Sequence, residues 1–298
     1  TSGKSSVVYY LRQLLEKAGH TVGSLSTIDF YIAGEDKLND QKMTMLGRMQ
    51  IQKYLREMVD KGCSVAIVET TSEGRVQHRH RFINYDMMIL TNLYPEHIKS
   101  HGSFKKYKQA KIDLFTHTAS SVSKVLPRSF ARWEKGVSIP KIALINTDHE
   151  EVDVRGEFAH HEFAEVYGFS AYKPGSALND SMWLASDEFV LRKIGSKVRG
   201  VDDNTASVDA EELLRLPIEF SHAELNKAIA ASALAIFGES QKTVRSMLID
   251  VTNPPGRVEF ISESEEFGFK VIVDYAFEPV ALTGLYNAVS ALNPRRII

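Results

Sequence analysis

The stretch VAIVETTS, residues 65–72, passes from four apolar residues directly into a polar run. MMILTN at 87–92 and KIALINTD at 141–148 follow the same pattern. Short apolar runs of this kind are typical of strands buried on both faces, as in parallel sheets covered by helices. Ligands of such sheets bind at the carboxyl ends of the strands, so we expect the polar residues after these runs to lie in a binding site.

Helical patterns alternate with these runs. Residues 5–18 and 43–61 carry apolar side chains at helical spacing, and an alanine-rich helix is predicted from Glu224 to Phe237. A strand is predicted at 21–26, whereas residues 151–216 are less regular. The alternation predicts an α/β fold built on a mainly parallel sheet that is flanked by helices.

Chain length and one turn cluster indicate how the chain is divided. Its 298 residues suit about two domains, and the candidate boundary is Asn253-Pro254-Pro255-Gly256. We therefore expect one domain at residues 1–253, and the beginning of a second α/β domain, with two strands and a helix, at residues 254–298. Because the chain starts at Thr1 rather than at a methionine and ends on a strand-like run, we expect it to be a fragment.

Composition argues against several classes of protein. The 36 Lys and Arg residues are balanced by 38 Asp and Glu residues, whereas a general nucleic-acid binder needs excess positive charge. The single cysteine, Cys63, excludes an intrachain disulfide and favours a reducing cytoplasm. No apolar run approaches the about 18 residues of a membrane span. We expect a cytoplasmic protein without nucleic-acid or membrane partners.

The motif Gly3-Lys4-Ser5-Ser6 opens the first predicted helix and matches the second half of a phosphate-binding loop. Backbone N–H groups at a helix start bind phosphate, the lysine adds a point charge, and the serine hydroxyl can bind Mg²⁺. Alone, the motif is equally well explained by a surface turn. The helix and strand that follow favour the phosphate loop.

Three further positions could carry chemistry. Glu69 follows a predicted buried strand, where a Mg²⁺-binding acid lies in many phosphate-loop enzymes, although on position alone a solvated carboxylate is somewhat more common. His97 follows the strand that ends at Leu90, and Lys111 lies on an otherwise apolar helix face. Taken singly, a histidine is more often structural and a lysine more often solvated.

Motifs spread along the chain resemble those of the Mur ligase family, whose members use ATP to join amino acids to UDP-N-acetylmuramoyl precursors. The matching segments follow the family's order and cover nearly the whole chain; they are Thr1–Ser6, Asn92–Gly102, Tyr107–Phe115, Pro255–Glu259 and Asp274–Pro279. Within the family, Glu69–Arg79 is most similar to the same stretch of the tripeptide synthetases. The resemblance implies a phosphate-loop ATPase domain followed by the start of a Rossmann-like ligase domain.

The resemblance also implies a set of catalytic residues. The residues expected to bind the phosphates of ATP are Gly3, Lys4, Ser5 and Ser6, and those expected to hold two Mg²⁺ ions are Ser5, Glu69, His97 and Lys111. Lys111 matches the family's carbamylated lysine. Once joined to CO₂, its amine becomes an anion that can lie beside Mg²⁺, where an ammonium would be repelled.

Two more groups of residues are implied by the matching motifs. Those expected to contact the nucleotide are Asn226, Arg257 and Asp274. Those expected to hold the UDP-N-acetylmuramoyl substrate are Thr44, Thr71, Ser72, Gln77 and Arg79. Arg79 is the best candidate for the diphosphate, because a guanidinium fork matches two phosphate oxygens.

The activity implied by the resemblance is an ATP-dependent, ADP-forming acid–amino-acid ligase of peptidoglycan precursor synthesis, with Mg²⁺ as cofactor. Its substrates would be UDP-N-acetylmuramoyl-L-Ala-D-Glu and a diamino acid, either meso-diaminopimelate or L-Lys, and it would be a monomer. Glu73 and Phe277 stand where such enzymes have histidines. Two alternatives therefore stay open: a folylpolyglutamate or cyanophycin synthetase type of ligase, and a nucleotide-binding relative that does not ligate.

Overall fold

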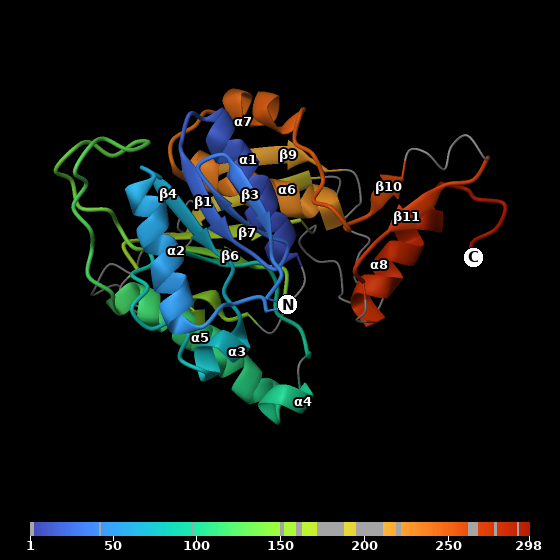
Figure 1. Cartoon of the computed structure of the whole chain (residues 1–298), viewed down its shortest axis with the longest axis horizontal. Coiled ribbons are helices and arrows are strands. Elements are labelled where there is room, and N and C mark those ends of the chain that lie inside the picture. The colour runs from blue at the N-terminus through green and yellow to red at the C-terminus, as the bar shows by residue number, and fades with distance from the viewer. Residues whose placement is uncertain are drawn as a thin grey trace.

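The three apolar runs form strands β4 (Val65–Val68), β5 (Met87–Leu90) and β6 (Ile142–Asn146) in the computed structural model (Figure 1). The structure describes residues 3–41, 43–96, 98–149, 152–158, 163–171, 188–194, 211–218, 222–261, 268–276, 279–290 and 292–298. The other strands are β1 (Val22–Leu25), β2 (Asp29–Ile32), β3 (Glu35–Leu38), β7 (Glu165–Ser170), β8 (Glu188–Ile194), β9 (Glu212–Pro217), β10 (Glu259–Ile261) and β11 (Val271–Val273). The helices are α1 (Lys4–Lys17), α2 (Arg48–Asp60), α3 (Ser72–Val76), α4 (Ile98–His101), α5 (Phe104–Ser120), the π-helical turn η1 (Val154–Phe158), α6 (His222–Ile236), α7 (Gln241–Leu248) and α8 (Pro279–Ser290).

Hydrogen bonds group the described strands into three sheets, of which two contain parallel pairs and the third is the antiparallel pair β10-β11. The first sheet has the order β3-β2-β1-β4, in which β1 and β4 are parallel. The second has the order β5-β6-β7-β8-β9, in which β5, β6 and β7 are parallel and the last two strands are added antiparallel. The predicted α/β class is confirmed, and the antiparallel strands at the sheet edges are an addition that the apolar runs did not indicate.

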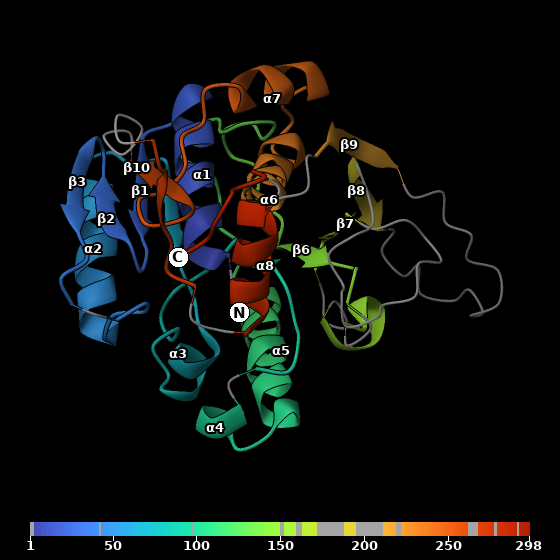
Figure 2. The same ribbon diagram turned by 90° about the vertical axis from the view of Figure 1, so that its right-hand side faces the viewer.

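Helices cover both faces of β6. Ile142 and Leu144 of β6 pack in the core formed with α1 and α6, whereas Ala143 and Ile145 pack on the other side with α5. Because successive side chains of a strand point to opposite faces, this burial explains why the whole run is apolar. Strand β4 lies at the edge of the first sheet and is only partly buried, with Ala66 exposed, so the prediction of burial on both faces is wrong for β4. Figure 2 shows α1 and α6 side by side, with α2 on the outer side of the first sheet.

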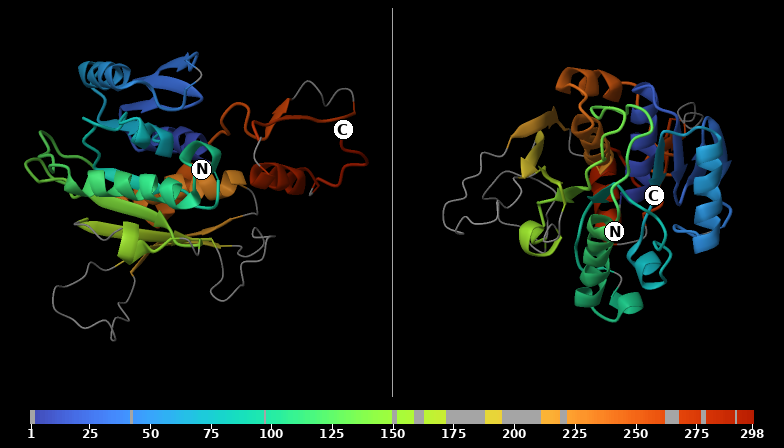
Figure 3. Two further views of the ribbon diagram at one scale, coloured as in Figure 1. Left: turned by 90° about the horizontal axis from the view of Figure 1, so that it is seen from below. Right: turned by 90° about the vertical axis from the view of Figure 1, so that its left-hand side faces the viewer.

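Helix α1 is tied to the chain that follows α7. The Tyr10 hydroxyl donates to Asn253 Oδ1 at 2.9 Å, and Gln13 exchanges two hydrogen bonds of 3.0 Å with the backbone of Thr252. The segment from β10 to α8 extends to one side of the sheets (Figure 3). The helix that begins at the Gly-Lys-Ser motif therefore anchors the chain at the point where we predict the domain boundary.

Several elements differ in their bounds from the sequence prediction. The helix predicted at 43–61 begins only at Arg48, because Gly47 is extended and acts as its N-cap. Met45 and Leu46 are nevertheless buried, and they pack in the core from a loop rather than from a helix. The irregular stretch 151–216 contains β7, β8 and all but the last residue of β9. None of the helices within the described ranges is both long and apolar enough to cross a bilayer.

His80 gives the fold a predictable dependence on pH. Its side chain is buried, with its ring centroid 4.9 Å from that of His117 on α5, and burial, His117 and Arg75 lower its pKa from 6.5 to about 4. Between these two pH values His80 is protonated in the unfolded chain but neutral in the folded chain. Stability therefore falls as the pH drops from 6.5 to about 4.

We expect protonation of His80 in the unfolded chain to lower the free energy of unfolding by about 2–3 kcal/mol between pH 6.5 and about 4. Thermal unfolding at a series of pH values measures the loss, and a His80→Phe variant, which cannot titrate, should lose less. His149 carries a shift in the same direction, so the variant should keep part of the decline. Equal slopes for the two proteins would contradict the assignment to His80.

Candidate functional site

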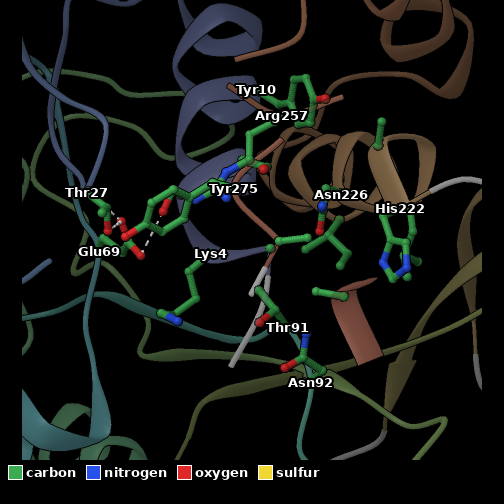
Figure 4. Close-up of a pocket in the computed structure, with 18 of the residues that line it drawn as sticks. Lys4, Tyr10, Thr27, Glu69, Thr91, Asn92, His222, Asn226, Arg257 and Tyr275 are labelled. Atoms are coloured by element: carbon green, nitrogen blue, oxygen red, sulfur yellow. Dashed lines mark hydrogen bonds between the residues drawn. The ribbon is translucent and has the colours of Figure 1, made fainter. Parts of the chain in front are cut away.

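A cavity of about 1240 Å³ opens where the start of α1, the carboxyl ends of β4, β5 and β6, and the start of α6 meet the chain after residue 253 (Figure 4). The predicted site residues that line it are Gly3, Lys4, Ser5, Ser6, Thr44, Glu69, Thr71, Ser72, Lys111, Asn226, Arg257 and Asp274. Gln77 and Arg79 are outside its lining, and His97 lies outside the described residues. The structure thus brings most of these residues together.

The phosphate-loop motif lies at the start of α1, where only glycine fits easily. Gly3 has a φ of 77°, and a Cβ at this position would lie 2.4 Å from Asn226 Oδ1 on α6. The backbone N–H groups in the first turn of α1 lie at the end of the helix that meets the cavity. Lys4 lies at the same end, and its side chain projects into the cavity (Figure 4). A helix start with an adjacent lysine is a site for an anion such as phosphate.

Glu69 is buried at the end of β4 and is held from two sides. Ser5 Oγ donates to Glu69 Oε1 at 3.0 Å. Thr27 donates to Glu69 Oε2 from its backbone N at 2.8 Å and from Oγ1 at 3.0 Å. Figure 4 shows Thr27 and Glu69 turned toward one another beside Lys4. The carboxylate is therefore fixed in one orientation before any ligand binds.

The chemistry of this pair fits a magnesium ion bound with a nucleotide. A hydroxyl and a carboxylate are oxygen ligands of the kind that Mg²⁺ takes, and they lie beside the phosphate-attracting start of α1. Within the described ranges no three His, Cys, Asp or Glu side chains come together as a metal cluster. The fit therefore rests on Ser5 and Glu69.

Thr27 was missed by the sequence reasoning. It follows the strand predicted at 21–26, so it repeats the pattern of a polar residue directly after a strand, which was applied only to the three apolar runs. Besides its bonds to Glu69, its Oγ1 lies 3.0 Å from Thr44 Oγ1, so Thr44 belongs to the same cluster of hydroxyls. The same signal, applied to every predicted strand, would have found Thr27.

Lys111 lies on α5 close to the end of β5. Its Nζ donates to the carbonyl oxygen of Asn92 at 3.3 Å. Burial and the Lys4 ammonium lower the pKa of Lys111 from 10.5 to about 8, against the opposing charge of Glu96. Near neutral pH, more of this amine is uncharged than in an exposed lysine, and only the uncharged amine reacts with CO₂. The environment of Lys111 therefore fits the implied carbamate.

The end of β6 contributes residues whose roles were unassigned. Asn146 donates to the carbonyl of Thr91 at 2.8 Å and accepts from the backbone N of Asp148 at 2.8 Å, which ties the ends of β5 and β6 together. His149 is buried against Tyr94 and lines the cavity. Burial, followed by the charge of Lys111, lowers the pKa of His149 to about 4, so this imidazole is neutral near pH 7.

Residues after the turn cluster form another wall of the cavity. The Arg257 guanidinium lies 5.0 Å from the ring centroid of Tyr275, and Figure 4 shows both side chains near the start of α1. Asp274 accepts from the backbone N of Val258 at 2.8 Å. Arg257 and Asp274, which the resemblance implies to contact the nucleotide, are thus held at one wall by β10, β11 and their flanking turns.

The residues predicted to hold the second substrate divide into two sets. Thr71 caps α3 by accepting from the backbone N of Gly74 at 2.9 Å, and Ser72 Oγ lies 3.0 Å from His101 Nε2. Arg79, by contrast, donates to the carbonyl oxygen of Met45, and Gln77 is exposed. In this structure the Arg79 guanidinium is directed at the loop before α2, so its predicted contact with a diphosphate stays a prediction.

Comparison with known proteins shows which protein family this chain is similar to. The model of the Mur ligase middle domain matches residues 1–189. The chain is 26% identical over 301 residues to a UDP-N-acetylmuramoyl-L-alanyl-D-glutamate–2,6-diaminopimelate ligase of Clostridium botulinum, covering 100% of this chain and 54% of that protein. The chain therefore spans about half the length of the curated relatives it matches.

Solved structures show the same fold at low sequence identity. A structure of a UDP-N-acetylmuramoyl-L-alanyl-D-glutamate–2,6-diaminopimelate ligase has a TM-score of 0.62 at 18% identity and covers 97% of this chain and 52% of that chain. A bifunctional folylpolyglutamate synthase/dihydrofolate synthase with Mn, AMPPNP and L-glutamate bound has a TM-score of 0.52 at 17% identity, over 98% and 64% of the two chains. These similarities concern the fold alone.

Proposed function

Because this chain belongs to the Mur ligase family, we propose that its protein is an ATP-dependent amide ligase that adds a diamino acid to UDP-N-acetylmuramoyl-L-Ala-D-Glu. The observation that carries the proposal is the Ser5–Glu69 pair at the start of α1, which lines one cavity together with Lys4 and Lys111. To bind a nucleoside triphosphate with its metal ion, a site needs a hydroxyl and a carboxylate for the metal and positive charge for the phosphates. The name of the Clostridium botulinum relative supports the choice of substrate.

The reaction has two steps that balance in atoms and charge. A carboxylate oxygen of the muramoyl dipeptide attacks the γ-phosphorus of ATP and displaces ADP, which leaves an acyl phosphate. The amine of the diamino acid then attacks the acyl carbon, inorganic phosphate departs, and the amine loses a proton to solvent or base. In the first step two anions approach each other, so stabilisation of negative charge dominates catalysis.

The chain's own residues supply most of that stabilisation. Lys4 and the backbone N–H groups at the start of α1 bind the β- and γ-phosphates and keep the γ-phosphorus facing the cavity. Mg²⁺, when bound, would neutralise charge on the phosphate oxygens and would be held by Ser5, Glu69, His97 and the carbamate of Lys111. Lys111 forms that carbamate when its neutral amine attacks CO₂ and releases a proton.

The remaining predicted residues would bind and orient the reactants. Those on the nucleotide side are Gly3, Ser6, Asn226, Arg257 and Asp274, and those on the muramoyl side are Thr44, Thr71, Ser72, Gln77 and Arg79. Closure of residues 254–298 over the cavity would exclude water, which would otherwise hydrolyse the acyl phosphate. We place this enzyme in the cytoplasm as a monomer, where ATP and the UDP-linked precursor are both available.

Arg79 favours a second candidate. Its guanidinium is bonded to the Met45 carbonyl instead of lining the cavity, so the predicted clamp for a UDP diphosphate is not formed in this structure. A folylpolyglutamate type of ligase, to which this chain is similar in fold through the second solved structure, would use the same ATP site without that clamp.

One assay separates these candidates. ADP release by the full-length protein is measured with ATP and Mg²⁺ plus UDP-N-acetylmuramoyl-L-Ala-D-Glu, with meso-diaminopimelate and L-Lys offered separately. We expect release only when the muramoyl dipeptide and one diamino acid are both present. Release with dihydrofolate and L-glutamate instead would favour the second candidate. No release with either pair, beside measurable ATP binding, would favour a relative that does not ligate.

A further inference from the structure

Helix α1 carries a buried arginine that the proposed reaction does not use. Arg12 lies seven residues after Ser5 and is 5% exposed, and its Nη1 lies 2.8 Å from Oδ2 of Asp29, which is 4% exposed. The guanidinium lies over two aromatic rings, 4.5 Å from the ring centroid of Tyr9 and 4.2 Å from that of Tyr31. An ion pair held between two rings has little freedom to move.

Asp29 in turn fixes the tight turn between β1 and β2. Ser26 Oγ donates to Asp29 Oδ1 at 2.9 Å and accepts from the backbone N atoms of Ile28 and Asp29, both at 3.1 Å. The backbone N of Ser26 also donates to the carbonyl oxygen of Asp29 at 2.9 Å. The Asp29 carboxylate therefore binds Arg12 of α1 through Oδ2 and Ser26 of the turn through Oδ1.

The residue inside this turn is Thr27, which holds Glu69. Its backbone N and Oγ1 both donate to Glu69 Oε2, and the other carboxylate oxygen accepts from Ser5 on α1. The contacts therefore join α1 to the turn at two places. Arg12 of α1 binds Asp29 of the turn directly, and Ser5 of α1 is joined to Thr27 of the turn through Glu69. Helix α1 cannot slide along its axis relative to the turn without breaking one of these buried bonds.

We propose that Arg12 and Asp29 are positioning residues that fix the β1–β2 turn against α1, so that Thr27 presents Glu69 to Ser5 in the orientation that binds Mg²⁺ together with a nucleotide. The inference rests on the proposed function, because it assumes that the Ser5–Glu69 pair takes a metal nucleotide. Neither residue would touch the nucleotide itself: their effect would be transmitted through Thr27 and Glu69.

The test is a double variant, Arg12→Met together with Asp29→Asn. Removing both charges avoids leaving one buried ion without its partner, and the amide oxygen introduced by Asp29→Asn can still accept from Ser26. ADP binding to the full-length protein is measured by calorimetry in excess Mg²⁺ and in EDTA, well below the thermal midpoint of each protein. We expect the gain in affinity from Mg²⁺ to fall by about tenfold or more, as for residues that orient metal ligands. Affinity in EDTA should change less than about twofold, since phosphate contacts at the start of α1 are unaltered.

A matched control uses an ion pair with one buried partner at the opposite end of the second sheet's strands. Lys141, 3% exposed and directly before β6, pairs at 3.2 Å with Asp86, whose side chain is 30% exposed, and neither residue lines the cavity. The variant Lys141→Met with Asp86→Asn should lose stability but keep the full Mg²⁺ gain. An unchanged gain in the Arg12 and Asp29 variant, or an equal loss in the control, would overturn the positioning role. Absence of any Mg²⁺ gain in the unmodified protein would overturn the proposed function, and this inference with it.

Discussion

Replacement of Lys111 by methionine should lower the rate of ADP formation by about 10³-fold, the scale seen when a preorganised charge is removed from a reaction centre. Methionine keeps an unbranched side chain of nearly the same length, so α5 should stay packed. It has no amine, so it can neither form a carbamate nor provide a charged group beside the phosphates. The measurement is steady-state ADP release by the full-length protein, together with its thermal midpoint to verify folding.

The control for this variant lies on the same helix. Lys108 precedes Lys111 by almost one turn of α5, pairs with Glu157, and does not line the cavity. Lys108→Met should leave the rate within about twofold, as expected for a partly exposed ion pair. With carbon-labelled bicarbonate in the buffer, the NMR signal of a protein-bound carbamate carbon should be present in the unmodified protein and in Lys108→Met. It should be absent in Lys111→Met. Full activity of Lys111→Met, or an unchanged signal, would rule out the carbamate.

A second large effect is expected for Glu69→Gln. The amide can still accept from Thr27, so the β1–β2 turn should keep its place, but the site loses one negative charge and one metal-binding oxygen. We expect the Mg²⁺ concentration for half-maximal rate to rise by about 10- to 100-fold and the maximal rate to fall by about 10²-fold. Initial rates across a Mg²⁺ titration give both quantities.

The conservative variant Ser5→Thr serves as the comparison for Glu69→Gln. Threonine keeps a hydroxyl for Glu69 and for the metal, so its titration should resemble that of the unmodified protein. If Glu69→Gln instead shifted the half-saturating concentration of ATP while leaving that of Mg²⁺ unchanged, Glu69 would act on the nucleotide alone. That outcome would contradict its assignment as a metal ligand.

The candidate site could be predicted from the sequence to the extent that it lies at the ends of apolar strands and at a helix start. Glu69 and the Gly-Lys-Ser motif were located in this way, because both signals are local. Lys111 required its motif, since nothing in a single helix face indicates that a lysine faces a cavity. The lowered pKa of Lys111 depends on burial and on Lys4, which only the folded chain brings near.

The parts of the fold that were predicted wrongly have two different physical reasons. Strand β3 is fully exposed and has the polar sequence EDKL, so no apolar pattern marks it. It exists because Ala33 and Gly34 take positive φ values of 52° and 94° and turn the chain back onto β2, a two-residue hairpin. Met45 misled the prediction of α2 in the opposite way: a buried apolar residue in a loop continues the helical periodicity by coincidence of spacing.

Gly3 illustrates how a folding requirement and a ligand requirement can coincide at one position. A saturation library would score residue 3 as intolerant even in a screen for folding alone, because every other residue is strained at its φ of 77° and crowds Asn226. Trimming Asn226 would relieve the crowding but not the backbone strain, so it would rescue a substitution of Gly3 only in part. Mutational intolerance at residue 3 is therefore no measure of nucleotide binding, whereas at Lys4, whose backbone is ordinary helix, it is.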